Sequence, residues 1–79
     1  MNKNEVAKIF GEEIRKIRAE VGISQERLAL EADVDRSFLS KMERGIRQPS
    51  LTVLLKLCRA LEYSPDKLVS EVSSKLSKT

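Results

Sequence analysis

The stretch SQERLALEADVDRSFLSKM, residues 24–42, decides the fold of this chain. Ser24 and Asp35 both suit N-cap positions, because their side-chain oxygens can accept a hydrogen bond from a free backbone N–H in the first turn of a helix. Apolar residues follow each cap at helical spacing: Leu28, Ala29 and Ala32 after the first, Leu39 and Met42 after the second. The Asp33-Val34 pair interrupts the pattern between them. The stretch therefore predicts two short helices joined by a tight turn.

The second short helix carries polar side chains between its apolar positions. Four of them can bond base edges or phosphates: Arg36, Ser37, Ser40 and Lys41. Residues 36–48 hold four basic residues against one acidic residue, which equals the net charge of the whole chain, +3. The positive field is therefore concentrated on this helix and on the loop after it. Two helices in this arrangement form a helix-turn-helix, whose second helix enters the major groove of DNA.

Length and composition limit the class of protein. The chain has 79 residues, which predicts one small domain, 1–79, and its 41% hydrophobic and 34% charged residues suit a compact folded chain. It has no histidine and a single cysteine, Cys58, which excludes most zinc sites, disulfide frameworks and histidine-based catalysis. A buried apolar role for Cys58 is favoured over a redox sensor. We expect no enzyme, metal site, cofactor or small-molecule ligand.

Helical periodicity extends along the chain and predicts an all-α fold. We place helices at residues 4–21, 25–32, 36–44, 51–62 and 65–76. An apolar stripe on the first helix is formed by Val6, Phe10, Ile14, Ile17 and Val21. The inner face of the fourth helix is assigned to Leu51, Leu54, Leu55, Cys58 and Leu61. Gly22 and Gly45 are left-handed stop signals, and Pro65 after Ser64 starts the last helix.

The chain also lacks signals for a membrane or for export. No segment approaches about 18 consecutive apolar residues, and the N-terminus has no apolar stretch typical of a signal peptide. We therefore expect a cytoplasmic protein.

Three motifs, in this order and spacing, resemble the XRE/Cro/phage-repressor type of helix-turn-helix regulator: IRKIRAEVGISQERLA, DRSFLSKMERG and PSLTVLLKLCRALEYSPDKL. The resemblance covers roughly residues 10–70 and implies a compact five-helix, lambda-repressor-like DNA-binding domain. The chain is also similar to the short controller proteins of restriction–modification systems, in its length, in the DRSF opening of the third helix and in having no added domain. The family usually has glycine where this chain has Asp33. Aspartate tolerates the left-handed region better than most residues, so we expect the turn to form.

The resemblance implies roles for the polar residues. The start of the third helix would point into the major groove, which gives base contacts to Arg36, Ser37, Ser40 and Lys41, with a phosphate as the alternative for Ser37 and Lys41. The resemblance also implies contacts to the DNA backbone for Ser24, Gln25, Arg44, Arg47 and Gln48. Gln25 can also brace Ser37. The alternative for the whole set is solvated side chains. Phe38 is expected to pack on the second helix rather than touch a thymine methyl group.

One charged pair is expected to be structural. In the resembling family an arginine on the first helix bonds the glutamate of the ERG motif, and Arg18 and Glu43 occupy these positions here. Such a pair would lock the first helix to the end of the third. If the pair is partly buried, losing one partner leaves the other charge unpaired, which costs more than losing a surface pair.

Some apolar residues exceed what one small core needs and are candidates for a dimer face: Val53, Leu57, Val69, Val72 and Leu76. The alternative is that some of them complete the core of the monomer. Dimerisation is a natural way for a small domain to add core. Two copies would present two recognition helices about 34 Å apart, on a near-palindromic operator.

The residues and the resemblance together predict a homodimeric, sequence-specific transcription regulator. Its partners would be double-stranded DNA and a second copy of the chain, with RNA polymerase added if it activates. Without a ligand domain, we expect regulation through protein concentration. The controller resemblance implies adjacent dimers on tandem sites that first activate and then repress the protein's own promoter. The alternative is a protein-binding module, such as an antitoxin or a partner of another regulator.

Overall fold

The computed structural model describes residues 1–77 and forms five helices in this range: α1 (Lys3–Val21), α2 (Gln25–Ala32), α3 (Arg36–Glu43), α4 (Leu51–Leu61) and α5 (Pro65–Ser77). The all-α prediction is confirmed, and every helix boundary lies within one residue of its predicted position. The last two residues of the predicted domain, 78–79, lie outside the described residues. None of the helices in this range is both long and apolar enough to span a membrane.

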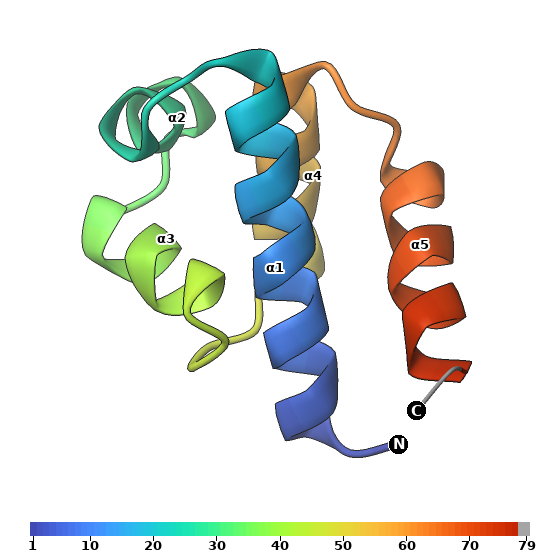
Figure 1. Ribbon diagram of the computed structural model, residues 1–79. Helices are drawn as coiled ribbons and strands as arrows, with labels where there is room; N and C mark the ends of the chain where they lie inside the picture. Colours follow the sequence, from blue (N-terminus) through green and yellow to red (C-terminus); the bar gives the residue numbers. More distant parts are fainter. Residues whose placement is uncertain (78–79) are drawn as a thin grey trace.

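α1 runs through the middle of the molecule, with α2 and α3 on one side, α5 on the other and α4 behind it (Figure 1). α1 contacts α3, α4 and α5, while α2 contacts α3 and α4. The two helices of the helix-turn-helix are therefore held against a scaffold formed mainly by α1 and α4.

Side-chain caps start four of the helices. An oxygen atom of each capping residue accepts a hydrogen bond from the backbone N–H three residues further on, and the capping residues are Asn2, Ser24, Asp35 and Ser50. At the C-terminal ends, Gly22 has φ 81°, and two non-glycine residues, Asp33 and Glu62, have φ 55° and 52°. The turn between α2 and α3 thus forms with aspartate in the left-handed region, as expected.

α1 buries one stripe and crosses α3 very closely. The buried stripe contains Phe10, Ile14 and Ile17, whereas Val21, predicted on the same stripe, is 52% exposed at the end of the helix. A methyl group at Gly11 would overlap the carbonyl oxygens of Met42 and Glu43. The missing side chain at Gly11 therefore lets the backbone of α1 touch the end of α3.

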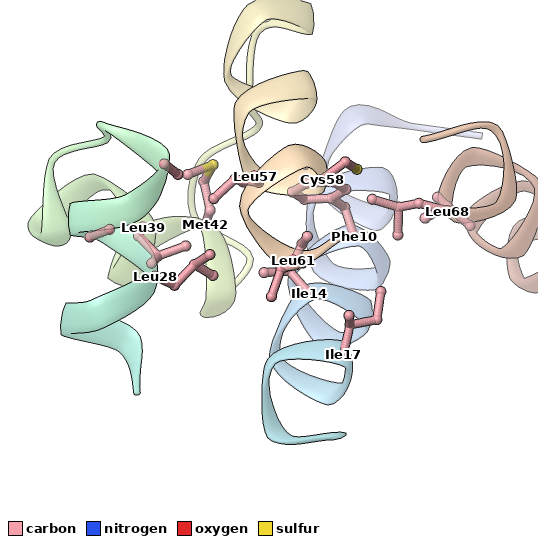
Figure 2. Close-up of a cluster of buried hydrophobic side chains, with 13 residues drawn as sticks. Phe10, Ile14, Ile17, Leu28, Leu39, Met42, Leu57, Cys58, Leu61 and Leu68 are labelled. Carbon is pink, nitrogen blue, oxygen red and sulfur yellow. The ribbon is translucent and has the colours of Figure 1, made fainter. Parts of the chain in front are cut away.

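The inner face of α4 differs from the predicted one. Leu51 and Leu55, assigned to that face, are 73% and 46% exposed, whereas Leu57, predicted to lie off it, is fully buried. Figure 2 gives the reason: Leu57 points towards Met42 of α3, while Cys58 lies on the side of α1. Because α4 is covered on two sides, its buried surface is rotated relative to the predicted stripe.

Candidate nucleic-acid interface

α3 buries one face and presents its first turn to solvent. The Oδ1 atom of Asp35 accepts a hydrogen bond from the backbone N–H of Phe38 at 3.2 Å and caps the helix. Leu39 and Met42 are fully buried, so the opposite face is anchored along its length. The two residues of the first turn that remain exposed are Arg36 and Ser37. Both lie at the end of α3 that the sequence predicts for base contacts.

The second turn of α3 is less open than the first. Ser40 and Lys41 are half-buried. Their backbone carbonyl oxygens accept hydrogen bonds from the following loop, from Arg44 N at 3.1 Å and from Ile46 N at 2.9 Å respectively. Phe38 packs against the hydrophobic core. Of the four predicted base-contact residues, two are thus exposed and two are half-buried.

A hydrogen-bonded cluster, formed by Arg18, Gln25 and Glu43, fixes the far end of α3. The carboxylate of Glu43, 5% exposed, accepts bonds from Arg18 Nε at 2.8 Å and Nη2 at 3.0 Å. Gln25 Nε2 donates to the same carboxylate at 3.1 Å. Arg18 Nη1 also donates to the carbonyl of Ile23 at 3.1 Å. The cluster joins α1, the start of α2 and the end of α3.

This cluster is structural rather than catalytic. Its hydrogen bonds to Glu43 raise the pKa of the Arg18 guanidinium, while burial acts in the opposite direction. The buried carboxylate is therefore compensated by a permanent charge and by neutral donors. Gln25, considered from the sequence as a brace for Ser37, braces Glu43 instead. That bond was not anticipated, because sequence spacing does not tell which side chain a glutamine will reach.

The predicted backbone-contact residues surround α3. All of them are exposed except the half-buried Gln25. The hydroxyl of Ser24 accepts a bond from Arg27 N at 3.0 Å, and Arg44 Nε reaches the carbonyl of Ser40 at 3.4 Å. The side chain of Gln48 donates to the backbone of α1. The start of α2 and the loop after α3 thus supply polar groups beside the far end of α3.

Cysteine and acidic side chains are the remaining groups of interest in the part of the chain that the structure describes. No group of three or more acidic, cysteine or histidine side chains in residues 1–77 is arranged to hold a metal ion. Cys58 is 1% exposed, and burial raises its pKa, so its thiol is a core group.

The predicted dimer face needs correction. Leu57 is fully buried, points towards Met42 of α3 (Figure 2) and cannot contact a second subunit, and Val72 is only 9% exposed. Val53 and Leu76 are half-buried, and Val69 is 53% exposed. Leu51 and Leu55 of α4, which the sequence assigned to the inner face, are exposed instead. The stripe of α4 that contains Leu55 and the stripe that contains Leu57 both have helical spacing. Only the positions of α2 and α3 decide which of the two is buried.

A second polar link, missed from the sequence, ties α5 to α1. Glu13 is 2% exposed on α1, and its Oε1 atom forms an ion pair with Nζ of Lys75 on α5. Nearby, the hydroxyl of Tyr63 donates to Glu71 at 2.6 Å. The signal available in the sequence was weak, because Glu13 lies beside apolar positions on a helix otherwise rich in exposed charges.

The fold and this surface define a class: a small helix-turn-helix protein with an exposed, cationic recognition helix, as found in DNA-binding transcription regulators. A family model described as helix-turn-helix matches residues 14–68. The chain belongs to the helix-turn-helix family.

Named relatives agree with that class. The chain is 39% identical over 67 residues to control protein C.BamHI of Bacillus amyloliquefaciens, covering 84% of this chain and 83% of the relative. Its fold matches the restriction-modification controller protein C.AhdI of Aeromonas hydrophila, with a TM-score of 0.76 and 42% identity, covering 78% and 94% of the two chains. It also matches SinR, a master regulator for biofilm formation solved in complex with DNA, with a TM-score of 0.73, 36% identity and coverage of 76% and 97%. The chain is a DNA-binding transcription regulator.

Proposed function

We propose that this chain acts as a homodimer that reads a near-palindromic operator through the first turn of α3 and regulates its own promoter. One observation carries the proposal: Arg36 and Ser37 are exposed at the capped end of a helix whose opposite face and far end are both anchored. A side chain on such a helix reaches a base edge with little loss of backbone freedom.

Base recognition in this proposal starts with Arg36. Its guanidinium can bond O6 and N7 of a guanine together, a contact worth about 1–3 kcal/mol of discrimination against a wrong base. Ser37 lies beside it, and the half-buried Ser40 and Lys41 extend the contact by one turn. Affinity would come largely from phosphates bound by the surrounding set: Ser24, Gln25, Arg44, Arg47 and Gln48.

The second subunit would dock on the outer surface of α4 and α5. Leu51 and Leu55 of α4 and Val69 of α5 are large, exposed and apolar. An apolar groove of about 200 Å³ lies between α1, α4 and α5, lined in part by Pro49, Leu54 and Val69. Half-buried Val53 and Leu76 would complete the contact. Burying these groups in a dimer would add the core that a small domain otherwise lacks.

Control by concentration would follow from such a dimer. Few subunits would leave the operator empty, and accumulation would yield dimers and then occupied sites. The similarity to proteins named as controllers supports control of a restriction–modification system as the biological setting. A bound dimer that covers a promoter would repress it, and activation would add RNA polymerase as a partner in the cytoplasm.

Selection from a pool of random duplexes tests this proposal. The parent protein should enrich a near-palindromic sequence, and gel shift on that duplex should weaken as salt increases. Arg36→Ala should relax the preference at one base pair per half-site, by about 1–3 kcal/mol, with folding intact. Lys16→Ala is the charge-matched control, since Lys16 is an exposed cation on α1 with Glu12 and Glu20 one helical turn away on either side.

Two outcomes would contradict the proposal in different ways. An Arg36→Ala protein that prefers the same bases as the parent would mean that α3 does not face the bases with its first turn. Failure to enrich any duplex would remove DNA recognition itself and would favour the protein-binding alternative.

A further inference from the structure

The loop after α3 is not a free loop, because it lies along the first turns of α1. Figure 1 shows the loop passing beside the N-terminal half of that helix. Gln48 Nε2 donates a hydrogen bond to the carbonyl of Lys3 at 2.9 Å. At Gly45, which has φ 77°, a Cβ atom would stand 2.9 Å from the Cα atom of Lys8. The two segments are thus in backbone contact at one point and hydrogen-bonded at another.

The helical register of α1 continues this contact. Asn4, Lys8 and Gly11 recur at spacings of four and three, so they share one face of the helix. Gly11 is the residue that touches the backbone at the end of α3. The face of α1 that carries Lys8 is therefore the face turned towards α3 and its loop.

A shallow depression of about 280 Å³ lies where the two segments meet. It is lined by Lys3, Asn4, Ala7, Ile46, Arg47 and Gln48. Its rim is cationic, because residues 1–11 and 44–48 together hold four basic side chains and one acidic side chain, Glu5. Lys3, Lys8, Arg44 and Arg47 are all exposed. Asn4 and Gln48 add amide groups that can bond phosphate oxygens.

We propose that the first two turns of α1 form a second DNA-binding surface, continuous with the loop after α3, in which Lys3 and Lys8 bind phosphates of the DNA backbone beside the half-site read by α3. This inference rests on the proposed function, because the surface is placed on DNA by the docking of α3. It adds cations that the helix-turn-helix motif itself does not contain. Phosphates bound there hold the register of the protein on the duplex without adding sequence preference.

The test uses the duplex enriched by the parent protein and compares two variants of equal charge. In the first, Lys3→Gln is combined with Lys8→Gln. In the second, Lys16→Gln is combined with Lys67→Gln; Lys16 lies one turn from both Glu12 and Glu20 on α1, so the local field there is not positive. Both variants remove two exposed lysines and lower the net charge equally. A difference between them therefore reports position rather than total charge.

The readout is the dependence of affinity on salt, measured by fluorescence anisotropy. For the Lys3/Lys8 variant, the slope of log affinity against log salt should flatten by about 0.9 for each phosphate that a bound subunit no longer neutralises. Its ranking of operators with single base changes should match that of the parent. The Lys16/Lys67 variant should keep the slope of the parent.

The possible outcomes distinguish failure of this inference from failure of the proposed recognition of DNA by α3. If the parent binds the duplex and the parent and the Lys3/Lys8 variant have the same slope of log affinity against log salt, the inference is overturned. Recognition by α3 is then left intact. A changed ranking of operators would place the lysines on bases and would also overturn it. Absence of binding by the parent to every duplex would overturn both.

Discussion

The pairs α2–α3 and α4–α5 have similar connections, but α3 and α4 are held to the molecule by different forces. In each pair the first helix ends at a non-glycine residue with positive φ, Asp33 or Glu62. α3 is held at its end by the cluster of Arg18, Gln25 and Glu43, whose hydrogen bonds have fixed directions. α4 is held mainly by apolar packing, with Leu57 fully buried. Directional bonds set the orientation of the recognition helix, while packing sets the position of α4.

The comparison matters for function because the two pairs have different tasks. A recognition helix must hold its side chains at a fixed angle to the base edges, and directional hydrogen bonds restrict that angle better than apolar contacts do. In the proposed dimer, the outer surface of α4 and α5 needs only an apolar face of suitable shape. Variants in the two regions should therefore fail in different ways.

The largest change in the free energy of unfolding is expected at Leu57, whose side chain contributes through packing alone. Leu57→Ala should lower the free energy of unfolding by about 2–5 kcal/mol, because the side chain is fully buried and leaves a cavity. Urea unfolding at a fixed protein concentration measures it. Leu55→Ala on the same helix is the control: it should cost less than about 1 kcal/mol in folding and weaken self-association in sedimentation. Equal losses of stability in the two variants would mean that the face of α4 is assigned wrongly.

A smaller loss of stability, together with a loss of DNA affinity, is expected for Arg18→Ala. The cost should be about 2–3 kcal/mol, below the roughly 3–5 kcal/mol of a fully buried pair, because the Arg18 side chain is 19% exposed and Gln25 still bonds Glu43. DNA affinity should fall further than stability predicts, since the end of α3 loses its strongest restraint. The matched control is Arg27→Ala, which removes an exposed pair with Glu31 within α2. Unchanged DNA affinity of folded Arg18→Ala would show that the cluster does not orient α3.

The smallest change in the free energy of unfolding is expected for Tyr63→Phe; Tyr63 lies beside the start of α5. Its hydrogen bond to Glu71, then burial and nearby carboxylates, raise the pKa of Tyr63 from 10.0 to about 12. Because the folded pKa is the higher one, this bond stabilises the protein below about pH 10, and its contribution is lost as pH rises towards about 12. The difference in unfolding free energy between the parent and Tyr63→Phe should therefore be constant near neutral pH and shrink over that window. A difference that stays constant to pH 12 would contradict the assignment.

The sequence predicts the helix-turn-helix segment better than the helices after it, for a physical reason. Caps such as Ser24 and Asp35 act within three residues, so their effect can be read locally. The pairing of Arg18 with Glu43 came only through the family resemblance, since the two residues are far apart in sequence. The inward stripe of α4 was wrong, because stripes containing Leu55 and Leu57 both fit a helix.

The amino-acid sequence by itself determined the number of helices, their ends and the cationic character of α3, because capping, helical periodicity and charge are local properties of the chain. Only the tertiary structure decided which face of α4 is buried, that Glu13 pairs with Lys75 on α5, and that the loop after α3 lies against Lys3 and Lys8. These features depend on the distance between segments remote in sequence, which is set by how the helices of residues 1–77 fill one small core.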